Sequence, residues 1–204
     1  MVTDKIVLKN INKSFVLNDK KVSVFEDFSM EFDPGIINVI IGKSGCGKTT
    51  LLRMIAGLEK PDSGELYIPE ELKVGMVFQE DRLMPWLSCE KNVTLGMKGV
   101  DKNSVYSVLE TVGLKGFEKA YPSQLSGGMR QRVSLARALI RDSNLLLMDE
   151  PFSALDAFTR KEMQEELLRV RKKMNAGIIF VTHDMNEAML LGDRIITLGR
   201  EKIF

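Results

Sequence analysis

A glycine-rich octet near the start of the chain constrains the fold more than any other feature. Residues 42–49 read Gly-Lys-Ser-Gly-Cys-Gly-Lys-Thr and fit the phosphate-loop pattern G-x-x-x-x-G-K-[ST]. The apolar, largely β-branched run Ile36–Ile41 precedes the octet, and Thr50–Leu58 follows it with a helical pattern. Because backbone N–H groups and the positive end of a helix bind phosphate together, this order predicts a nucleotide site.

The residue types of the octet each fit phosphate chemistry. Glycine lets the backbone curl around an anion, Lys48 can neutralise the β- and γ-phosphates, and the Thr49 hydroxyl can ligate Mg²⁺. As a loop residue, Lys48 is expected to be exposed and to add little to the core. The expected nucleotide contacts are Gly42, Lys43, Ser44, Gly45, Cys46, Gly47, Lys48, Thr49 and Thr50.

The chain has two cysteines, Cys46 and Cys89, and one histidine. Because Cys46 lies in the glycine-rich loop, a structural disulfide is not expected. Cys46 could be a reactive thiol, since a helix N terminus lowers a thiol pKa, or a small residue at a variable loop position. The second interpretation is favoured, and the cysteines and the histidine do not form a cluster with metal-ligand spacing.

A second apolar run ends in two carboxylates. Leu145–Met148 leads directly into Asp149 and Glu150, and ligands bind at the carboxyl ends of parallel strands in open α/β sheets. Two solvated acids at a strand end are the alternative, and without a phosphate loop that alternative would be preferred. With the loop on a neighbouring strand, Asp149 is expected to hold Mg²⁺ and Glu150 to polarise the attacking water.

Other segments complete the predicted elements. Strands are expected early in the chain, helices in its middle, and alternating strands and helices towards its end. The expected early strands are Lys5–Ile11, Val22–Phe25, Phe28–Phe32 and Val74–Phe78, with a turn at Pro61–Gly64. The expected later elements are a helix at Phe158–Met174 with Met163, Leu167, Val170 and Met174 inward, a strand at Gly177–Thr182, a helix at Met185–Leu191 and a strand at Arg194–Leu198.

The segment 80–140 is helical in character. Val105, Leu109 and Val112 share one helical face before Gly113; a second face is formed by Met129, Val133, Ala136 and Ile140. The prediction is one α/β domain over 1–204, a P-loop NTPase (RecA-like) core with an N-terminal antiparallel β subdomain and an inserted α-helical subdomain. The core with its β subdomain is expected to span 1–79 and 142–204, and the helical subdomain 80–141.

A second glycine motif separates this chain from other P-loop proteins. Leu125–Arg132 reads Leu-Ser-Gly-Gly-Met-Arg-Gln-Arg, so Ser126, Gly127 and Gly128 lie directly before a helix and form a second anion-ready N terminus. A small-molecule kinase would leave this motif unexplained. Two phosphate-binding ends on one chain suggest that a nucleotide is shared between two chains.

With these motifs, the sequence resembles the ATPase subunits of ABC transporters over nearly its whole length. The resemblance implies ATP and Mg²⁺ as cofactors and a homodimer with ATP at its interface. The cap Ser126–Gly128 of one copy would contact the γ-phosphate held by the other. Gln79 matches the residue that links Mg²⁺ and water to the membrane partner, and Ser153–Asp156 matches the loop that crosses the dimer interface, with Asp156 near the nucleotide.

Two further residues match the family. His183 matches the histidine that contacts the γ-phosphate, and Phe15 matches the aromatic residue that stacks on adenine. A structural histidine and a core phenylalanine are the alternatives, and both are less favoured. The metal ligands implied are Thr49, Gln79 and Asp149, and the catalytic residues implied are Glu150, His183, Gln79 and Lys48.

The segment 81–87 places large apolar side chains, including Trp86, in a polar setting. It looks like the surface that receives an integral membrane permease, although Trp86 could equally pack inside the helical lobe. The sequence of residues 79–86 is similar to that of the same segment in ATPase subunits of nitrate, sulfonate, taurine or thiamine-precursor importers. The resemblance therefore implies a permease partner, an indirect link to a solute-binding protein, and a peripheral place at the cytoplasmic face of the membrane.

Composition excludes some alternatives. The net charge is +1, which gives no general attraction to nucleic acid. No apolar run approaches the roughly 18–20 residues that span a bilayer.

Other classes of ABC protein fit the sequence less well. Those that act on DNA need a long coiled coil between the phosphate loop and the second glycine motif, and the interval 49–125 has no room for one. Those that act on ribosomes carry two cassettes in one chain, whereas this chain has one. Because the sequence ends just after the last predicted strand, we expect it to lack a carboxy-terminal regulatory domain.

Overall fold

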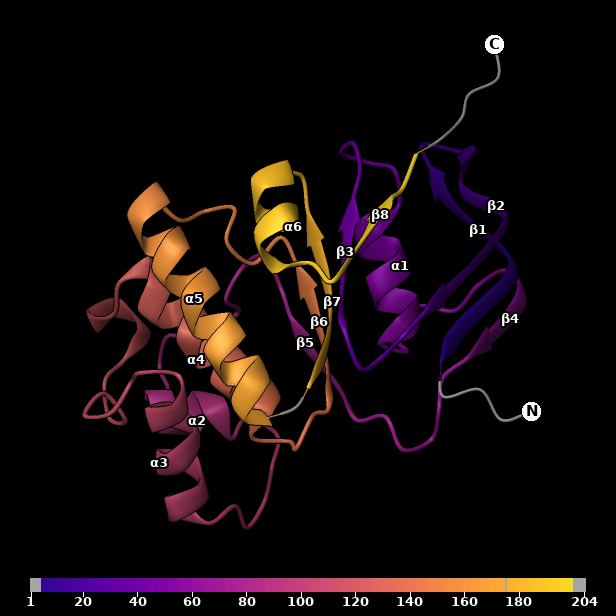
Figure 1. The fold of residues 1–204 in the computed structure, drawn as a ribbon. Coiled ribbons are helices and arrows are strands. Elements are labelled where there is room, and N and C mark those ends of the chain that lie inside the picture. Colours follow the sequence, from indigo (N-terminus) through magenta and orange to yellow (C-terminus); the bar gives the residue numbers. More distant parts are fainter. Residues whose placement is uncertain (1–4, 175, 200–204) are drawn as a thin grey trace. The chain divides into compact units, whose positions relative to one another are not determined.

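The computed structural model describes residues 5–174 and 176–199. They divide into two compact units, one built from residues up to 72 together with those from 177 onward, and one built from 73–176 (Figure 1). Both units combine strands and helices, which confirms the predicted α/β class. The finer division into a core and a helical subdomain over 80–141 stays a prediction.

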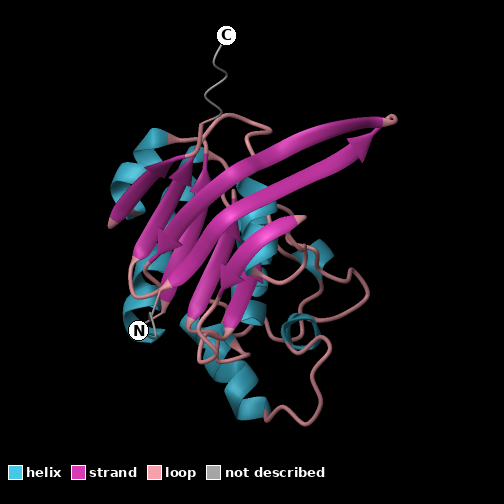
Figure 2. Cartoon of the chain, turned by 90° about the vertical axis from the view of Figure 1, so that its right-hand side faces the viewer, coloured by secondary structure: helices cyan, strands magenta, loops and turns pink. Residues whose placement is uncertain are grey.

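The first unit begins with an antiparallel sheet of β1 (Ile6–Leu17), β2 (Lys20–Phe32) and β4 (Ser63–Tyr67), in the order β2-β1-β4. The core-facing residues in the first half of β1 are apolar, since Ile6, Leu8 and Ile11 are almost fully buried. β1 and β2 continue as a long hairpin to the turn at Asn18–Asp19 (Figure 2).

This sheet differs from the sequence prediction in three places. The two short strands expected between Val22 and Phe32 are one strand of 13 residues, because a register shift near Asp27, which has φ 48°, absorbs the polar break. β1 runs past Ile11 to Leu17. The turn expected at Pro61–Gly64 passes into β4 at Ser63. Hydrophobic patterning did not reveal these strands because polar residues interrupt the apolar ones and much of each strand is exposed.

A second set of strands in the first unit is parallel. β3 (Ile37–Ile41) lies between β7 (Gly177–Thr182) and β8 (Arg194–Thr197), with Ile41 opposite both Thr182 and Thr197. Helices α1 (Lys48–Ile55) and α6 (Met185–Leu191) connect to these strands. β3 is buried, as a strand flanked on both sides is expected to be. The residues that follow β3 and β7 therefore emerge at one edge.

The second unit pairs β5 (Val74–Val77) in parallel with β6 (Leu145–Asp149), with Val77 opposite Met148. Its helices are α2 (Cys89–Val93), α3 (Lys102–Thr111), α4 (Gly127–Leu139) and α5 (Ala157–Met174), with a 3₁₀ turn at Pro122–Gln124. α4 is central, since it packs against α2, α3, α5 and β5.

The helical faces of this unit follow the sequence pattern with exceptions near helix ends. Val133 and Ala136 of α4 are fully buried, whereas Met129 and Ile140 are only half-buried. In α5, Met163, Leu167 and Val170 are buried as predicted. The inward placement of Met174 is wrong: it is the last residue of α5 and is 36% exposed, because the helix ends where its packing ends.

Candidate functional site

The phosphate loop of the first unit connects β3 to α1. β3 ends at Ile41, the loop turns through Gly42–Gly47, and α1 begins at Lys48, two residues earlier than predicted. The N-cap of α1 is Gly47, which has no side chain that could cap the helix. A helix start that follows a glycine loop is a typical phosphate-binding element, and phosphate binding here stays a prediction.

Gly47 is the residue that lets this turn form. Its φ of 106° lies in the left-handed region, and any side chain there would meet Val24 and Phe25 of β2, with atoms 2.8 Å from the first added carbon. Both the backbone angle and the close approach of β2 exclude other residues. Strand β2 of the antiparallel sheet therefore packs directly against Gly47 of the phosphate loop.

Lys48 is buried rather than exposed, so that part of the sequence prediction is wrong. Its exposed fraction is 5%, and its Nζ donates hydrogen bonds to the carbonyl oxygens of Gly42 at 2.7 Å and Lys43 at 3.1 Å. The ammonium group is therefore tied to the first two residues of the loop. Contact of Lys48 with phosphate stays a prediction.

The remaining loop residues divide by exposure. Lys43, Ser44 and Gly45 are exposed, whereas Cys46 and Gly47 are buried, and Thr49 and Thr50 are half-buried. Cys46 is 8% exposed and its sulfur lies beside Gly42. This packing supports the interpretation of Cys46 as a small loop residue. The other cysteine, Cys89, is also buried, and burial raises the pKa of its thiol to about 11.

Phe15 lies on β1 opposite Val22 and is half-buried. Lys13 places its ammonium group 4.9 Å from the centre of the Phe15 ring. Lys13 is itself fixed by Glu59 at 3.2 Å and by the carbonyl oxygen of Lys60 at 2.8 Å. Phe15 is therefore held in place without being part of the buried core, and adenine stacking on it stays a prediction.

His183 follows β7 directly and is exposed. Because Thr182 lies opposite Ile41 in parallel strands, His183 and the start of the phosphate loop emerge at the same sheet edge. Asp184 caps α6 behind the histidine by accepting a hydrogen bond from the N–H of Asn186 at 2.7 Å. A surface position at this edge fits a ligand-contacting histidine better than the buried structural alternative.

In the second unit, Asp149 and Glu150 end β6. Asp149 is 8% exposed, and Glu150 adopts the left-handed φ of 43°, which is uncommon for a residue other than glycine. Strained backbone of this kind persists where the surrounding structure fixes it, and it is concentrated at functional sites. The separate roles of Asp149 and Glu150 stay predictions.

Gln79 is linked to the backbone of Glu150 within the same unit. Its Nε2 donates to Ser153 Oγ at 3.2 Å, and Ser153 Oγ donates to the Glu150 carbonyl oxygen at 2.9 Å. The parallel pairing of Val77 with Met148 explains the proximity, since both strands end at the same edge. The structure thus brings together Gln79 and Glu150, which the sequence placed 71 residues apart.

The second glycine motif forms the start of α4. Ser126 is the N-cap, and its Oγ accepts a hydrogen bond from the N–H of Met129 at 3.2 Å. Gly127 is exposed, whereas Gly128 is buried against Thr159 of α5, whose methyl group would overlap any side chain at Gly128. The predicted cap is therefore a helix N terminus with Ser126 and Gly127 at the surface.

Asp156 has a clear structural role at the start of α5. Its carboxylate accepts hydrogen bonds from the Thr159 hydroxyl at 2.7 Å and from the N–H groups of Thr159 and Phe158, so it caps the start of α5. The hydrogen bond from the Thr159 side chain is the main cause that lowers the pKa of Asp156. A contact of Asp156 with nucleotide stays a prediction.

Sequence reasoning missed two sets of residues. Lys13, which fixes Phe15, sits in a run of polar residues that gave no signal of burial. Asp81 and Arg130, which form an ion pair of 2.9 Å, are 49 residues apart, and no sequence pattern predicts such a pairing.

Comparison with known proteins gives one consistent result. The sequence model of the family described as ABC transporter matches residues 25–153. The aliphatic sulfonates import ATP-binding protein SsuB of Bacillus cereus is 45% identical over 203 residues, which cover 95% of this chain and 81% of that protein. An uncharacterized ABC transporter ATP-binding protein of Methanocaldococcus jannaschii is 45% identical over 206 residues, covering 95% and 77%.

Solved structures agree with the sequence relatives. A dimeric ATP-binding cassette in a post-hydrolysis state, bound to ADP and Pi, matches with a TM-score of 0.83 and 31% identity over 95% of this chain and 94% of that chain. A second structure, a dimeric bacterial ABC transporter cassette, matches with a TM-score of 0.81 and 32% identity. These matches confirm the predicted P-loop ATPase fold.

Proposed function

The chain belongs to the ABC transporter family, and we propose that it powers import of a small solute as one of two copies that share two ATP molecules. ATP-binding subunits of this family hydrolyse ATP, so ATP hydrolysis is the activity of this chain. The observation that carries the proposal is the glycine loop before α1, whose N-cap is Gly47 and across which Lys48 Nζ donates hydrogen bonds to the carbonyl oxygens of Gly42 and Lys43.

We assign the chemistry to residues at the strand ends. Glu150 would position and polarise the water, Gln79 would orient it through its tie to Ser153, and His183 would contact the γ-phosphate. Mg²⁺ would be held by Thr49, Asp149 and Gln79 together with phosphate oxygens, since this ion binds through few carboxylates plus substrate phosphates. When bound, it would neutralise charge on the phosphates.

The shared site follows from the two helix starts. Each chain has one phosphate loop at α1 and one exposed helix start at Ser126–Gly127. Two copies related by a twofold axis would place the helix start of each against the nucleotide of the other. The solved relatives described as dimeric ATP-binding cassettes support this arrangement.

Membrane attachment would depend on a partner. Within the described residues, no helix is both long enough and apolar enough to cross a membrane. Trp86, by contrast, is 70% exposed, as the docking interpretation predicted, and an exposed tryptophan in a polar setting is typical of a protein interface. We assign residues 81–87 to contact with an integral membrane permease at the cytoplasmic face.

The solute is assigned only by class. The relatives named for aliphatic sulfonates import favour import, and aliphatic sulfonates are the first solutes to test. The ATPase subunit itself would not touch the solute, since the permease and a solute-binding protein would select it. The relative from Methanocaldococcus jannaschii is equally similar, at 45% identity, but its name gives no solute, so sequence identity alone does not select one.

Replacing Lys48 tests the phosphate assignment. Lys48→Met keeps most of the buried stem but removes the ammonium group and its two hydrogen bonds to the loop, so a stability loss of about 1–3 kcal/mol is expected while the protein still folds. Loss of a hydrogen bond to a charged group costs about 1.5–3 kcal/mol, so ATP should bind about 10- to 100-fold more weakly. Titration calorimetry with ATP and a melting curve would measure both effects.

The matched control is Lys9→Met, because Lys9 is an exposed lysine of β1 in the same unit and lies outside the predicted nucleotide site. It should keep ATP affinity within about threefold, as expected for loss of an exposed charge. Equal affinities for both variants and the parent would remove Lys48 from phosphate binding.

Replacing Trp86 tests the docking surface. Trp86→Ser should leave melting and the ATPase activity of the isolated subunit unchanged, because the side chain is largely exposed. An interface tryptophan is commonly worth 2 kcal/mol or more, so binding to the permease should weaken about 30-fold. Val16→Ser, at a position that is 73% exposed on the β1–β2 hairpin, is the control. Equal permease binding by both variants would refute the docking assignment.

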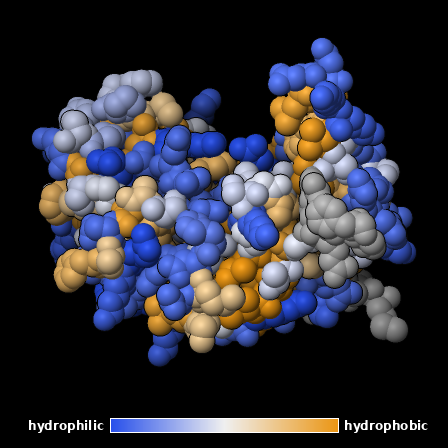
Figure 3. Space-filling model, turned by 90° about the horizontal axis from the view of Figure 1, so that it is seen from above, coloured by the Kyte–Doolittle hydropathy of each residue, from blue (hydrophilic) through white to orange (hydrophobic). Residues whose placement is uncertain are grey.

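The control residue lies on a distinct apolar surface. Val16 and Leu17 are 73% and 60% exposed at the hairpin end. The hydrophobic side chains there stand among hydrophilic ones, as seen at the upper right of Figure 3. Val16→Ser therefore removes a comparable exposed apolar group from a surface to which we assign no permease contact.

A further inference from the structure

The segment from Phe78 to Leu87 is held by side chains of the helix that Ser126 caps. Gln131 of α4 donates to the Phe78 carbonyl oxygen at 3.2 Å. Arg137, two turns along α4, donates to the Asp81 carbonyl oxygen at 2.7 Å and to that of Arg82 at 2.9 Å. α4 therefore fixes the backbone of this segment at several points.

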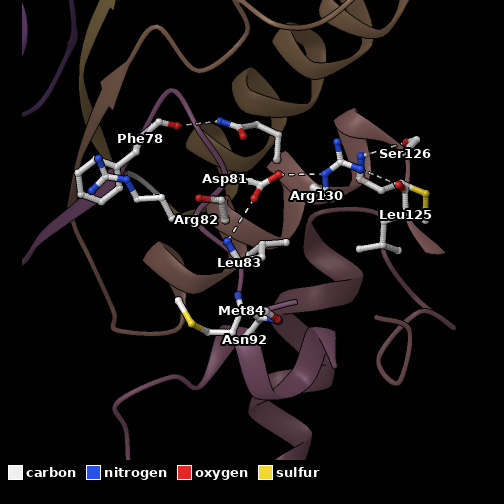
Figure 4. A network of polar contacts seen from close by, with 12 residues as sticks. Phe78, Asp81, Arg82, Leu83, Met84, Asn92, Leu125, Ser126 and Arg130 are labelled. Atoms are coloured by element: carbon white, nitrogen blue, oxygen red, sulfur yellow. Dashed lines mark hydrogen bonds and ion pairs between the residues drawn. The ribbon is translucent and has the colours of Figure 1, made fainter. Parts of the chain in front are cut away.

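Asp81 joins the two ends of this arrangement through its two carboxylate oxygens. Oδ2 accepts from Arg130 Nε at 2.9 Å, and Oδ1 accepts from the N–H of Leu83 at 3.2 Å (Figure 4). Arg130 in turn donates from Nη1 to the Leu125 carbonyl oxygen at 2.9 Å. A continuous line of hydrogen bonds thus runs from the residue before Ser126 to a residue three positions before Trp86.

The rest of the segment is rigid. Arg82 has a left-handed φ of 49° and stacks on Phe78, with its guanidinium carbon 3.8 Å from the ring centre. Asn92 lies beside Met84 (Figure 4) and accepts from its N–H at 2.8 Å. Its amide group also donates to the carbonyl oxygens of Met84 and Leu87. A shift imposed on Asp81 would therefore move the Trp86 end as a body rather than be absorbed by a flexible loop.

We propose that the Asp81–Arg130 ion pair is a positioning contact that transmits movement of the Ser126 cap to the Trp86 surface. The proposal rests on the shared-ATP function above. When Ser126 engages the γ-phosphate on a second copy, the Leu125 carbonyl moves with it. Arg130 follows because it bonds that carbonyl, and Asp81 passes the displacement to Leu83.

Exposure and geometry indicate positioning rather than stabilisation. The side chains of Arg130 and Asp81 are 37% and 29% exposed, and ion pairs at such positions add little to stability. The guanidinium group, however, fixes two acceptors at set directions with Nε and Nη1, which a lysine could not do. Of the α4 side chains described above, Arg130 alone bonds both Leu125 and Asp81.

Trp86 is the only tryptophan of the chain, so its fluorescence reports on this segment. The parent protein for the test is Glu150→Gln, to which ATP and Mg²⁺ are added. Iodide quenching of Trp86 and sedimentation are measured on the same samples. We expect ATP to produce a dimer and to change the quenching constant of the parent.

Asp81→Asn and Arg130→Gln, each in that parent, should still form the ATP-dependent dimer with unchanged melting but lose most of the quenching change. Arg130→Lys should behave like Arg130→Gln, and the Asp81→Asn, Arg130→Gln double variant should show no further loss, since both residues act in one contact. Arg132→Gln is the matched control on α4, because Arg132 donates to the Val112 carbonyl oxygen instead.

Two results would overturn the proposal. A full quenching change in Asp81→Asn or Arg130→Gln would show that the cap and the Trp86 surface move independently of the pair. Loss of the ATP-dependent dimer in these variants would assign the pair to the cap itself. Failure of the shared-ATP function is distinguished from both, because the Glu150→Gln parent would then remain monomeric in sedimentation.

Discussion

Glu150→Gln should bind ATP normally and hydrolyse it about 10²–10⁴ times more slowly than the unchanged protein, the range expected when a positioned base is lost. Glutamine has nearly the same shape and can occupy the strained turn at φ 43°, but it carries no charge to polarise water. Steady-state phosphate release at saturating ATP measures the rate, and calorimetry measures the binding.

The control for this change is Glu165→Gln, which makes the same substitution on an exposed position of α5 in the same unit. It should hydrolyse ATP at the parent rate. If Glu150→Gln hydrolyses ATP at a rate within a few fold of the unchanged protein, Glu150 is not the base. Metal binding by Asp149 would then be the one role left for the carboxylates after β6.

Ser126→Arg should lose hydrolysis by about 10²–10³-fold, the cost of removing donors aimed at charge that develops in a reaction. The long side chain would occupy the surface where a second copy places its γ-phosphate. ATP binding to each single chain should persist, because the phosphate loop lies in the other unit and is unchanged. Phosphate release and nucleotide binding are measured on the same preparation.

Local stability must be separated from this effect, since Ser126 also caps α4 through the N–H of Met129. Ser126→Ala removes the cap without adding bulk and should cost about 1 kcal/mol of stability. Ser104→Arg places the same bulk at an exposed serine near the start of α3 and should leave hydrolysis unchanged. If Ser126→Arg retains the parent rate, the trans cap is not needed for hydrolysis.

The motif-bearing elements could be predicted from sequence because each is a strand or helix with one dominant signal. The run before Gly42 and the run before Asp149 are continuous and apolar, so β3 and β6 were placed within one residue of their observed bounds. Parallel pairing then explains why Gln79 and Glu150 meet. Exposed strands carry no such signal: β4 is mostly polar, and the tip of β1 is exposed although it is apolar.

Contacts that depend on side-chain packing could not be predicted. The sequence predicts an exposed Lys48 because a lysine in a loop is usually exposed, but in the structure its side chain is buried. The cation of Lys13 over Phe15 and the pair of Asp81 with Arg130 join residues whose types are common on protein surfaces. Only the tertiary arrangement of each unit reveals the cation–π contact and the ion pair.

The central claim is that two copies share ATP, and sedimentation of Glu150→Gln tests it most directly. Without nucleotide the protein should be a monomer, because the interface would be formed largely by the nucleotides. With ATP and Mg²⁺ at saturation it should become a dimer that holds two ATP, whereas Glu150→Gln with Ser126→Arg should stay monomeric and still bind ATP. A Glu150→Gln protein that binds ATP and remains a monomer at saturation would contradict the shared site.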